Sequence, residues 1–223
     1  MPMIEFKRED GSSCKGYLSK AKASGKPSVI VLQEWWGVNE HMCNVADRFA
    51  AAEFNALVPD LFDGRVTQDP DEASHLMNGL DFEGAVYKDI RGAVKHMKEN
   101  LGAQKVAVVG FCMGGALTIA SAVHLSEVSA AVCFYGFPDK EFADPANIRI
   151  PFQGHFAAHD TWASPELVNQ AEAALKTAGQ HPDIYSYDAQ HAFFNEMRPE
   201  VFDAEAASLA WGRTLDFLSK HPL

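Results

Sequence analysis

The sequence has few cysteines, and none of the spacings that build metal sites or disulfide frameworks. Its 223 residues include four cysteines that stand far apart, with no Cys-x-x-Cys pair. We therefore expect free thiols in a reducing cytoplasm, a setting that permits a reactive cysteine. The four are Cys14, Cys43, Cys112 and Cys133.

Positive charge and long apolar runs are also scarce. Lysine and arginine number 19 against 30 aspartates and glutamates, giving a formal net charge of −11. Such a surface repels nucleic acid and anionic membranes, so we expect neither as a partner. No run is apolar enough to span a bilayer, and the charged first ten residues are unlike a signal peptide. The sequence thus predicts a cytoplasmic protein that acts on a small molecule.

The chain is predicted to form one α/β domain over residues 1–223, because it has ordinary globular composition and no repeats. A hairpin over residues 3–19 precedes strands that alternate with helices, which predicts a mostly parallel sheet with an antiparallel N-terminal edge and helices on both faces. Residues 60–80 are expected to be a loop with at most one short helix. The expected strands are 28–32, 56–58, 105–109, 129–134, 150–156 and 183–187, and the expected helices are 40–53, 81–97, 165–179 and 203–218.

The most informative segment is an apolar run over residues 106–109, followed by Gly110-x-Cys112-x-Gly114 and a helix-forming run. A strand, a sharp turn and a helix are the context of a nucleophile elbow. The glycines leave room beside the reactive residue, and the helix N-terminus favours developing negative charge. This pattern predicts Cys112 as a nucleophile.

A cysteine nucleophile needs a base, and the base needs an orienting acid. In α/β-hydrolases the order along the chain is nucleophile, acid, histidine. Asp160 and His191 follow Cys112 in that order, each just past an expected strand. Because ligand sites lie at the carboxyl ends of parallel strands, we expect the three to meet at one sheet edge.

Other assignments of these residues are weaker. Asp188 is nearer to His191 in sequence, but it belongs to a strand end and is expected to face solvent. His159 as the base would reverse the order of acid and histidine. A metal site would need His155 and His159 together, yet an extended strand separates them by about 13 Å, too far for one zinc ion with bonds of about 2 Å. We therefore expect no metal.

Acyl transfer also needs an oxyanion hole. The backbone N–H groups of Met113 and Trp35 are the expected donors, although Trp35 and Trp36 are also suited to cover the sheet. Glu34 would lie near Cys112, where its carboxylate opposes formation of a second anion. Our hypothesis is that Glu34 keeps the resting thiol protonated and hard to alkylate, then helps remove its proton once substrate displaces it.

Four parts of the sequence together resemble the dienelactone hydrolase, or carboxymethylenebutenolidase-like, family: residues 33–39, 110–115 and 189–193, and Asp160. The resemblance covers nearly the whole chain. It implies an α/β-hydrolase fold, a Cys–His–Asp triad, no cofactor and usually a monomer. It also implies that Glu34 contacts the resting thiol, and that the activity is hydrolysis of dienelactone, related enol-lactones or activated esters.

The sequence departs from the family where substrate is held. Members that cleave dienelactone are expected to bind its carboxylate with two arginines, and the matching positions here are Pro70 and Asn195. Arg65 and Arg198 are potential substitutes, but both are interpreted as surface charges. Aromatic residues beside the expected loops favour an uncharged, apolar or aromatic acyl group instead. The predicted substrate-binding residues are Trp36, Phe62, Tyr135, Phe137, Trp162, Phe193 and Asn195.

These patterns predict a hydrolase of small esters or lactones that forms a thioester on Cys112. A dinucleotide-binding reading fails, because Cys112 takes the place of the middle glycine of Gly-x-Gly-x-x-Gly. The alternative from a different class is a non-catalytic thiol or redox sensor on the same fold. Such a sensor would have no use for an ordered Asp160 and His191.

Overall fold

An eight-stranded sheet forms the centre of the computed structural model, which describes residues 3–221. Its strand order is β1-β2-β4-β3-β5-β6-β7-β8. The strands from β4 to β8 pair in parallel, whereas β2 is antiparallel to β1 and to β4. The predicted parallel sheet with an antiparallel edge is therefore confirmed. The strands are β1 Met3–Lys7, β2 Ser13–Ser19, β3 Ser28–Leu32, β4 Asn55–Pro59, β5 Val106–Phe111, β6 Ala130–Phe134, β7 Phe152–His159 and β8 Asp183–Gln190.

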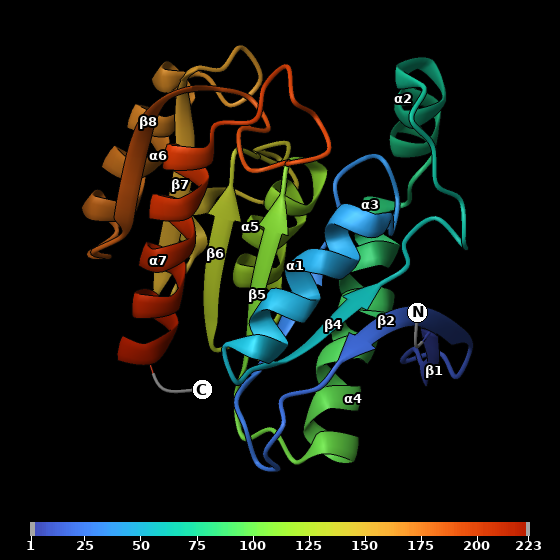
Figure 1. Cartoon of the computed structure of the whole chain (residues 1–223). Coiled ribbons are helices and arrows are strands. Elements are labelled where there is room, and N and C mark those ends of the chain that lie inside the picture. The colour runs from blue at the N-terminus through green and yellow to red at the C-terminus, as the bar shows by residue number, and fades with distance from the viewer. Residues whose placement is uncertain (1–2, 222–223) are drawn as a thin grey trace.

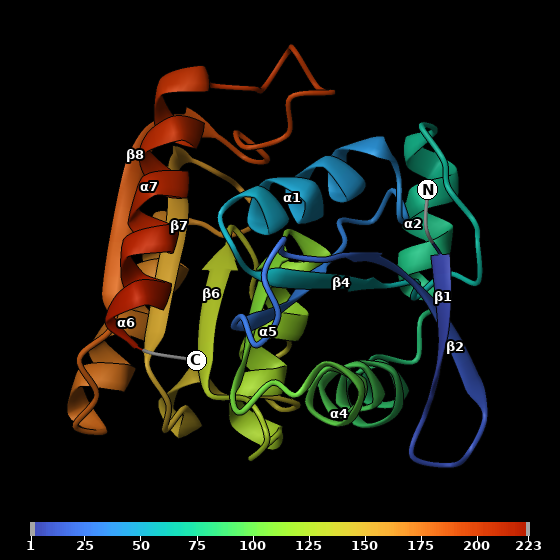
Figure 2. The same ribbon diagram turned by 60° about the horizontal axis from the view of Figure 1, so that its bottom comes forward.

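Helices cover both faces of this sheet, as Figures 1 and 2 show from two directions. Helices α1 (Glu40–Ala51) and α7 (Ala204–Lys220) lie on one face, and α4 (Arg91–Leu101), α5 (Met113–His124) and α6 (Pro165–Thr177) lie on the other. This double cover explains why β3 and β5 are buried along their whole length. Within residues 3–221, no helix has both the length and the apolarity to cross a membrane.

The connection from β4 to α4 holds one short helix within residues 60–80, which agrees with the expected loop and short helix. It contains α2 (Pro70–Asn78), whose N-cap Asp69 accepts hydrogen bonds from the N–H groups of Asp71 and Glu72. Only Ala73 and Leu76 of α2 are buried, so the helix has too little apolar periodicity to be predicted firmly. Next come α3 (Phe82–Gly84), the π-helical turn η1 (Ala85–Ile90) and α4. A later connection holds the short 3₁₀ turn η2 (Pro145–Asn147).

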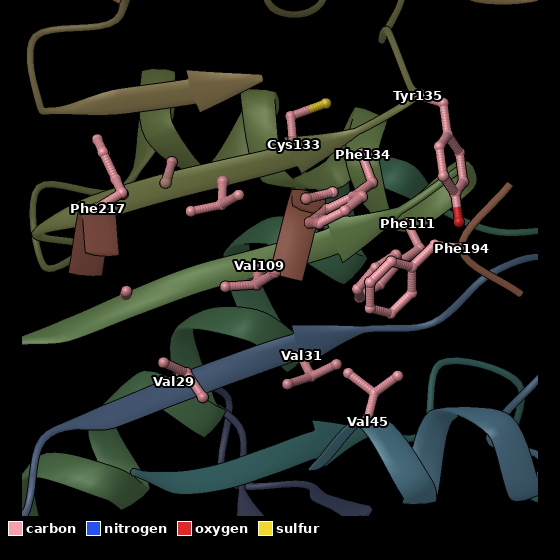
Figure 3. Packing of buried hydrophobic residues seen from close by; sticks show 14 of the residues in the cluster. Val29, Val31, Val45, Val109, Phe111, Cys133, Phe134, Tyr135, Phe194 and Phe217 are labelled. Atoms are coloured by element: carbon pink, nitrogen blue, oxygen red, sulfur yellow. The ribbon is translucent and has the colours of Figure 1, made fainter. Parts of the chain in front are cut away.

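Alternation along the strands divides the core between the two faces of the sheet. On β3, Val29 and Val31 face α1, while Ile30 and Leu32 belong to the cluster under α4. Aromatic rings gather where the first cluster meets the carboxyl ends of β5 and β6 (Figure 3). The ring centroid of Phe111 is 4.5 Å from that of Phe134 and 5.1 Å from that of Phe194. This packing gives the loops above it a rigid support.

Two strands extend further than expected, and both extensions position candidate residues. Strand β7 continues to His159 and β8 to Gln190, so Asp160 and His191 come directly after the last strand residue. A register shift between Ala157 and His159 marks the end of this pairing. Both side chains therefore start from a fixed point at the sheet edge where β5 ends.

Candidate active site

Cys112 occupies a strained turn between β5 and α5. Its φ of 54° and ψ of −114° lie outside the regions that L-residues favour, a conformation that costs about 1–3 kcal/mol. The flanking glycines are required by close approach. A Cβ on Gly110 would lie 2.0 Å from the carbonyl oxygen of Gly114, and a Cβ on Gly114 would lie 2.3 Å from that of Leu32. The predicted reason for both glycines agrees with this geometry.

The structure brings the three predicted residues Cys112, His191 and Asp160 together. His191 Nε2 lies 3.2 Å from Cys112 Sγ, and His191 Nδ1 lies 2.7 Å from Asp160 Oδ2. The other oxygen of the buried Asp160 accepts hydrogen bonds from the backbone N–H groups of Trp162 (2.7 Å) and Ala163 (3.1 Å). Fixed on both oxygens, the carboxylate holds the imidazole ring with Nε2 toward the sulfur.

The histidine ring in this chain of contacts favours its charged form. Burial opposes the charge, but the hydrogen bonds to Asp160 and Cys112 and the negative charges at those positions outweigh it and raise the pKa of His191 to about 10. The ring is therefore expected to carry a second proton at neutral pH. The ring therefore places a positive charge beside the sulfur, opposite in sign to the charge of Glu34.

The competing histidine and acid lie elsewhere. His159 Nε2 and Asp188 Oδ1 form a pair 2.7 Å apart in which both side chains are exposed. His155 is buried behind the sheet edge, where its Nδ1 is 2.7 Å from the hydroxyl of Tyr187 and burial lowers its pKa to about 3. Throughout residues 3–221, no three His, Cys, Asp or Glu side chains are grouped to hold a metal ion.

Glu34 lies directly past the end of β3 in a buried position, with a partner on each oxygen. Oε1 accepts a hydrogen bond from the hydroxyl of Tyr135 (3.1 Å), and Oε2 accepts one from the side-chain amide of Asn195 (2.5 Å). Burial and the charge of Glu34 raise the pKa of Tyr135 well above its usual 10, so its hydroxyl stays a donor. In this structure Glu34 is thus held by Tyr135 and Asn195, while the sulfur of Cys112 faces His191.

Three of the predicted substrate-binding residues do not line the cavity that contains Cys112. Asn195 is buried, and its carbonyl oxygen accepts a hydrogen bond from the N–H of Met197 while its amide binds Glu34. Phe62 packs into the cluster under α4, and Phe193 packs between Tyr135 and Tyr187. All three follow strand ends closely, and their side chains turn inward to complete the core. None of the three lines the cavity above Cys112, so their role in substrate binding stays a prediction.

A cavity of about 690 Å³ opens above Cys112. Glu34 and His191 lie in its wall, as do the predicted Trp35, Trp36, Tyr135, Phe137 and Trp162, and also Met113. Arg198, which the sequence analysis interpreted as a surface charge, also lies in the wall; its guanidinium is 5.1 Å from the ring of Trp36, and its Nε donates to Glu200. Sequence reasoning missed the apolar residues that the β4–α4 connection contributes. Further lining residues are Met77, Leu80, Phe82, Ala116, Phe142 and Val201.

The strand order, the antiparallel edge and the strained turn after β5 define an α/β-hydrolase fold. The profile of the Dienelactone hydrolase family matches residues 14–222, and the chain belongs to this family of hydrolases. The predicted family and fold are thereby confirmed.

Known proteins resemble the chain over nearly its full length. It is 34% identical to Protein usf of Aquifex pyrophilus over 232 residues, which cover 98% of each chain. It is 31% identical over 229 residues, again 98% of each chain, to a protein of Aquifex aeolicus (strain VF5) provisionally named carboxymethylenebutenolidase. A solved dienelactone hydrolase-like promiscuous phosphotriesterase from metagenomic libraries has a TM-score of 0.87 at 22% identity, covering 99% of this chain and 98% of that one.

Proposed function

We propose that this protein hydrolyses small, mostly uncharged esters or lactones through a thioester on Cys112. The observation that carries the proposal is the Cys112–His191–Asp160 chain of contacts, at 3.2 and 2.7 Å, in the wall of an apolar cavity. Nucleophile, base and orienting acid in this relation are the parts that acyl transfer needs. Membership in a hydrolase family supports the same reaction class.

In the first half-reaction the thiolate of Cys112 attacks the carbonyl carbon, and the carbonyl electron pair moves to oxygen. The N–H groups of Met113 and Trp35 stabilise that oxyanion, since both residues line the cavity beside the sulfur. As the carbonyl re-forms, the bond to the leaving alkoxide breaks. The alkoxide takes the proton from Nε2 of His191, which leaves an alcohol and an acyl thioester.

In the second half-reaction neutral His191 accepts a proton from water as the water attacks the thioester carbonyl. The new tetrahedral intermediate expels the thiolate and releases the acid. Asp160 keeps the ring oriented through both steps, because its hydrogen bond to Nδ1 is present in the resting geometry. After the acid leaves, the site returns to its starting state.

We further propose that the charge of Glu34 keeps the resting Cys112 thiol protonated, and that Glu34 helps to remove its proton once substrate displaces the carboxylate. The test is the rate of iodoacetamide alkylation at Cys112 in Glu34→Gln, which we expect to exceed that of wild type. Glu40→Gln, an exposed acid in the first turn of α1, is the matched control and leaves the rate unchanged. A rate that stays the same or falls in Glu34→Gln contradicts this role.

The cavity supports neutral substrates rather than dienelactone itself. In the described part of the chain, Arg198 is the only lysine or arginine that lines it, and Asn195 is occupied by Glu34. We expect neutral lactones and esters to be hydrolysed faster than matched substrates that bear a carboxylate. Arg198→Gln tests whether the remaining guanidinium assists acidic substrates. If the guanidinium does so, the variant should lower kcat/KM for substrates with a carboxylate and leave kcat/KM for neutral substrates unchanged.

The decisive variant is Cys112→Ala, assayed with a p-nitrophenyl ester and with a lactone. We expect kcat to fall by about 10³-fold or more, as with loss of a catalytic nucleophile elsewhere. Cys43→Ala, on α1, is the control and keeps the activity. Intact-mass measurement after ester treatment should show an acyl adduct on Cys112. Undiminished hydrolysis in Cys112→Ala overturns the proposal, and an oxidised but never acylated Cys112 supports the thiol-sensor alternative.

The setting of the activity also stays a proposal. We propose a single-domain monomer in a reducing cytoplasm, and the lack of a disulfide bond within residues 3–221 supports the reducing compartment. Size-exclusion chromatography with light scattering measures the oligomeric state, and a dimer would contradict the monomer.

A further inference from the structure

The cavity above Cys112 has two ends, because segments from opposite sides of the sheet build it. The strand order places β4 on one side of β5 and places β7 and β8 on the other. Figure 1 shows α2 and α3 on the right of the molecule and β7 and β8 on the left. Lining residues from these segments therefore approach Cys112 from opposite directions.

One end of the cavity holds His191. The ring centroid of Trp162 lies 6.5 Å from that of His191 and 6.2 Å from that of Trp35, so the three rings form one wall. A leaving-group oxygen must come within about 3 Å of the nitrogen that protonates it. The leaving group of an ester therefore occupies this end, beside Nε2 of His191.

The other end of the cavity holds the acyl group, which stays bonded to the sulfur of Cys112 after the leaving group departs. Ala116 lies one turn into α5, on the same helix face as Cys112 and about 6 Å further along the axis. Its small side chain lines the cavity instead of filling it. The remaining walls are apolar and come from the segments after β4 and β6. They are Met77, Leu80, Phe82 and Phe142, all of which pack against the cluster under α4.

We propose that this second end is an acyl-binding arm whose length is set by Ala116, which makes the preferred substrates esters or thioesters of medium-length or aromatic apolar acids. The proposal rests on the proposed hydrolase function and names its substrate class. A cavity of about 690 Å³ falls in the range that encloses a drug-sized ligand and is far larger than an acetyl group requires. Leucine at position 116 would project three more carbons into the arm.

The test compares p-nitrophenyl octanoate with p-nitrophenyl acetate, which share a leaving group and differ only in the acyl arm. We expect wild type to favour octanoate by about tenfold or more in kcat/KM. Ala116→Leu should lower that ratio by about tenfold or more. The ratio is the readout, because a general disturbance of the elbow lowers both rates together. Ala173→Leu, the same change at an exposed position of α6, is the matched control and keeps the wild-type ratio.

A second variant enlarges the arm instead of shortening it, so the proposal can still be tested if Ala116→Leu misfolds. Phe82→Ala removes a wall of the arm and should move the best chain length from octanoate toward decanoate or longer. Binding is read independently of turnover by the rise in Tm with octanamide and with acetamide. We expect a rise with octanamide alone, and its loss in Ala116→Leu.

The outcomes separate the arm from the reaction. An acetate preference in wild type, equal ratios in wild type and Ala116→Leu, or no stabilisation by octanamide each overturn the acyl arm. Hydrolysis that persists in Cys112→Ala overturns the proposed reaction, and in that case octanamide binding that depends on Ala116 still supports the arm.

Discussion

The side-chain amide of Asn195 donates a hydrogen bond to Oε2 of Glu34 across 2.5 Å, and both side chains are buried. The two residues are 161 positions apart in sequence, one after β3 and the other in the loop that follows β8. The bond therefore ties the loop that bears Trp35 to the loop that bears His191. Because buried carboxylates need partners, this contact helps to fix the relative position of both loops.

Loss of the Asn195 amide should destabilise the fold. Asn195→Ala leaves one oxygen of a buried carboxylate without its donor, and we expect the free energy of unfolding to fall by about 1–3 kcal/mol in urea titrations. Asn169→Ala, at an exposed position of α6, is the control and changes it by less than about 0.5 kcal/mol. A Glu34→Gln background should reduce the effect of Asn195→Ala. Equal losses in both backgrounds contradict coupling between the two residues.

The close approach at Gly114 makes a second prediction. Gly114→Ala places a methyl group 2.3 Å from the carbonyl oxygen of Leu32, so β3 or the elbow must shift. We expect a loss of about 2 kcal/mol or more in stability, and of most ester hydrolysis. Gly212→Ala on α7 is the matched control, because its Cβ meets nothing within 4 Å. That change should be neutral or stabilise by up to about 1 kcal/mol.

The raised pKa of His191 predicts how activity and stability depend on alkaline pH. Leaving-group protonation needs the charged ring, so kcat/KM should fall as pH rises through about 10. The same shift stabilises the fold fully below the unfolded pKa of about 6.5, and this stabilisation is lost as pH rises through about 10. Asp160→Asn removes the hydrogen bond that sustains the charge and should move the alkaline limb toward neutral pH. A limb that stays in place contradicts this role of Asp160.

At acid pH the buried His155 should be the main cause of the loss of stability. Burial lowers its pKa to about 3, so below about pH 6.5 the unfolded chain binds a proton that the folded chain rejects. Its contribution to stability is present above pH 6.5 and declines by about 1.4 kcal/mol per unit as pH falls toward 3. Urea titrations from pH 7 to pH 4.5 should show a shallower decline for His155→Gln. His159→Gln, at an exposed position, should retain the wild-type slope.

Local pattern was enough to predict which three residues of the candidate site lie together. Cys112 is marked by the strand, turn and helix around it, and Asp160 and His191 by their order and by the strand ends that precede them. What local pattern cannot give is the partner of a side chain in a distant segment. Asn195 was expected to bind substrate from the resemblance to the family, yet its amide donates a hydrogen bond to Glu34, a residue that only the folded chain brings near.

The cavity walls were predicted less well for a related reason. In the sequence Arg198 cannot be distinguished from a surface charge. Only the stacking of its guanidinium on Trp36 places it in the cavity. Ala116 is one of several alanines in an apolar helix, and no periodic signal distinguishes the one that lines a cavity. Alternating strands and helices determined the sheet, whereas the mostly exposed α2 left little apolar pattern to detect.

The connection from β4 to α4 is separate from the segments that carry the proposed triad. It supplies Met77, Leu80 and Phe82 to the cavity, while Cys112, Asp160 and His191 leave from other strands. This connection is therefore one continuous segment that can be exchanged as a unit. Exchange with the corresponding piece of a relative should change which acid is released without rebuilding the reacting centre. New specificity in this fold is accessible by recombination of one continuous stretch of chain, in addition to stepwise substitution.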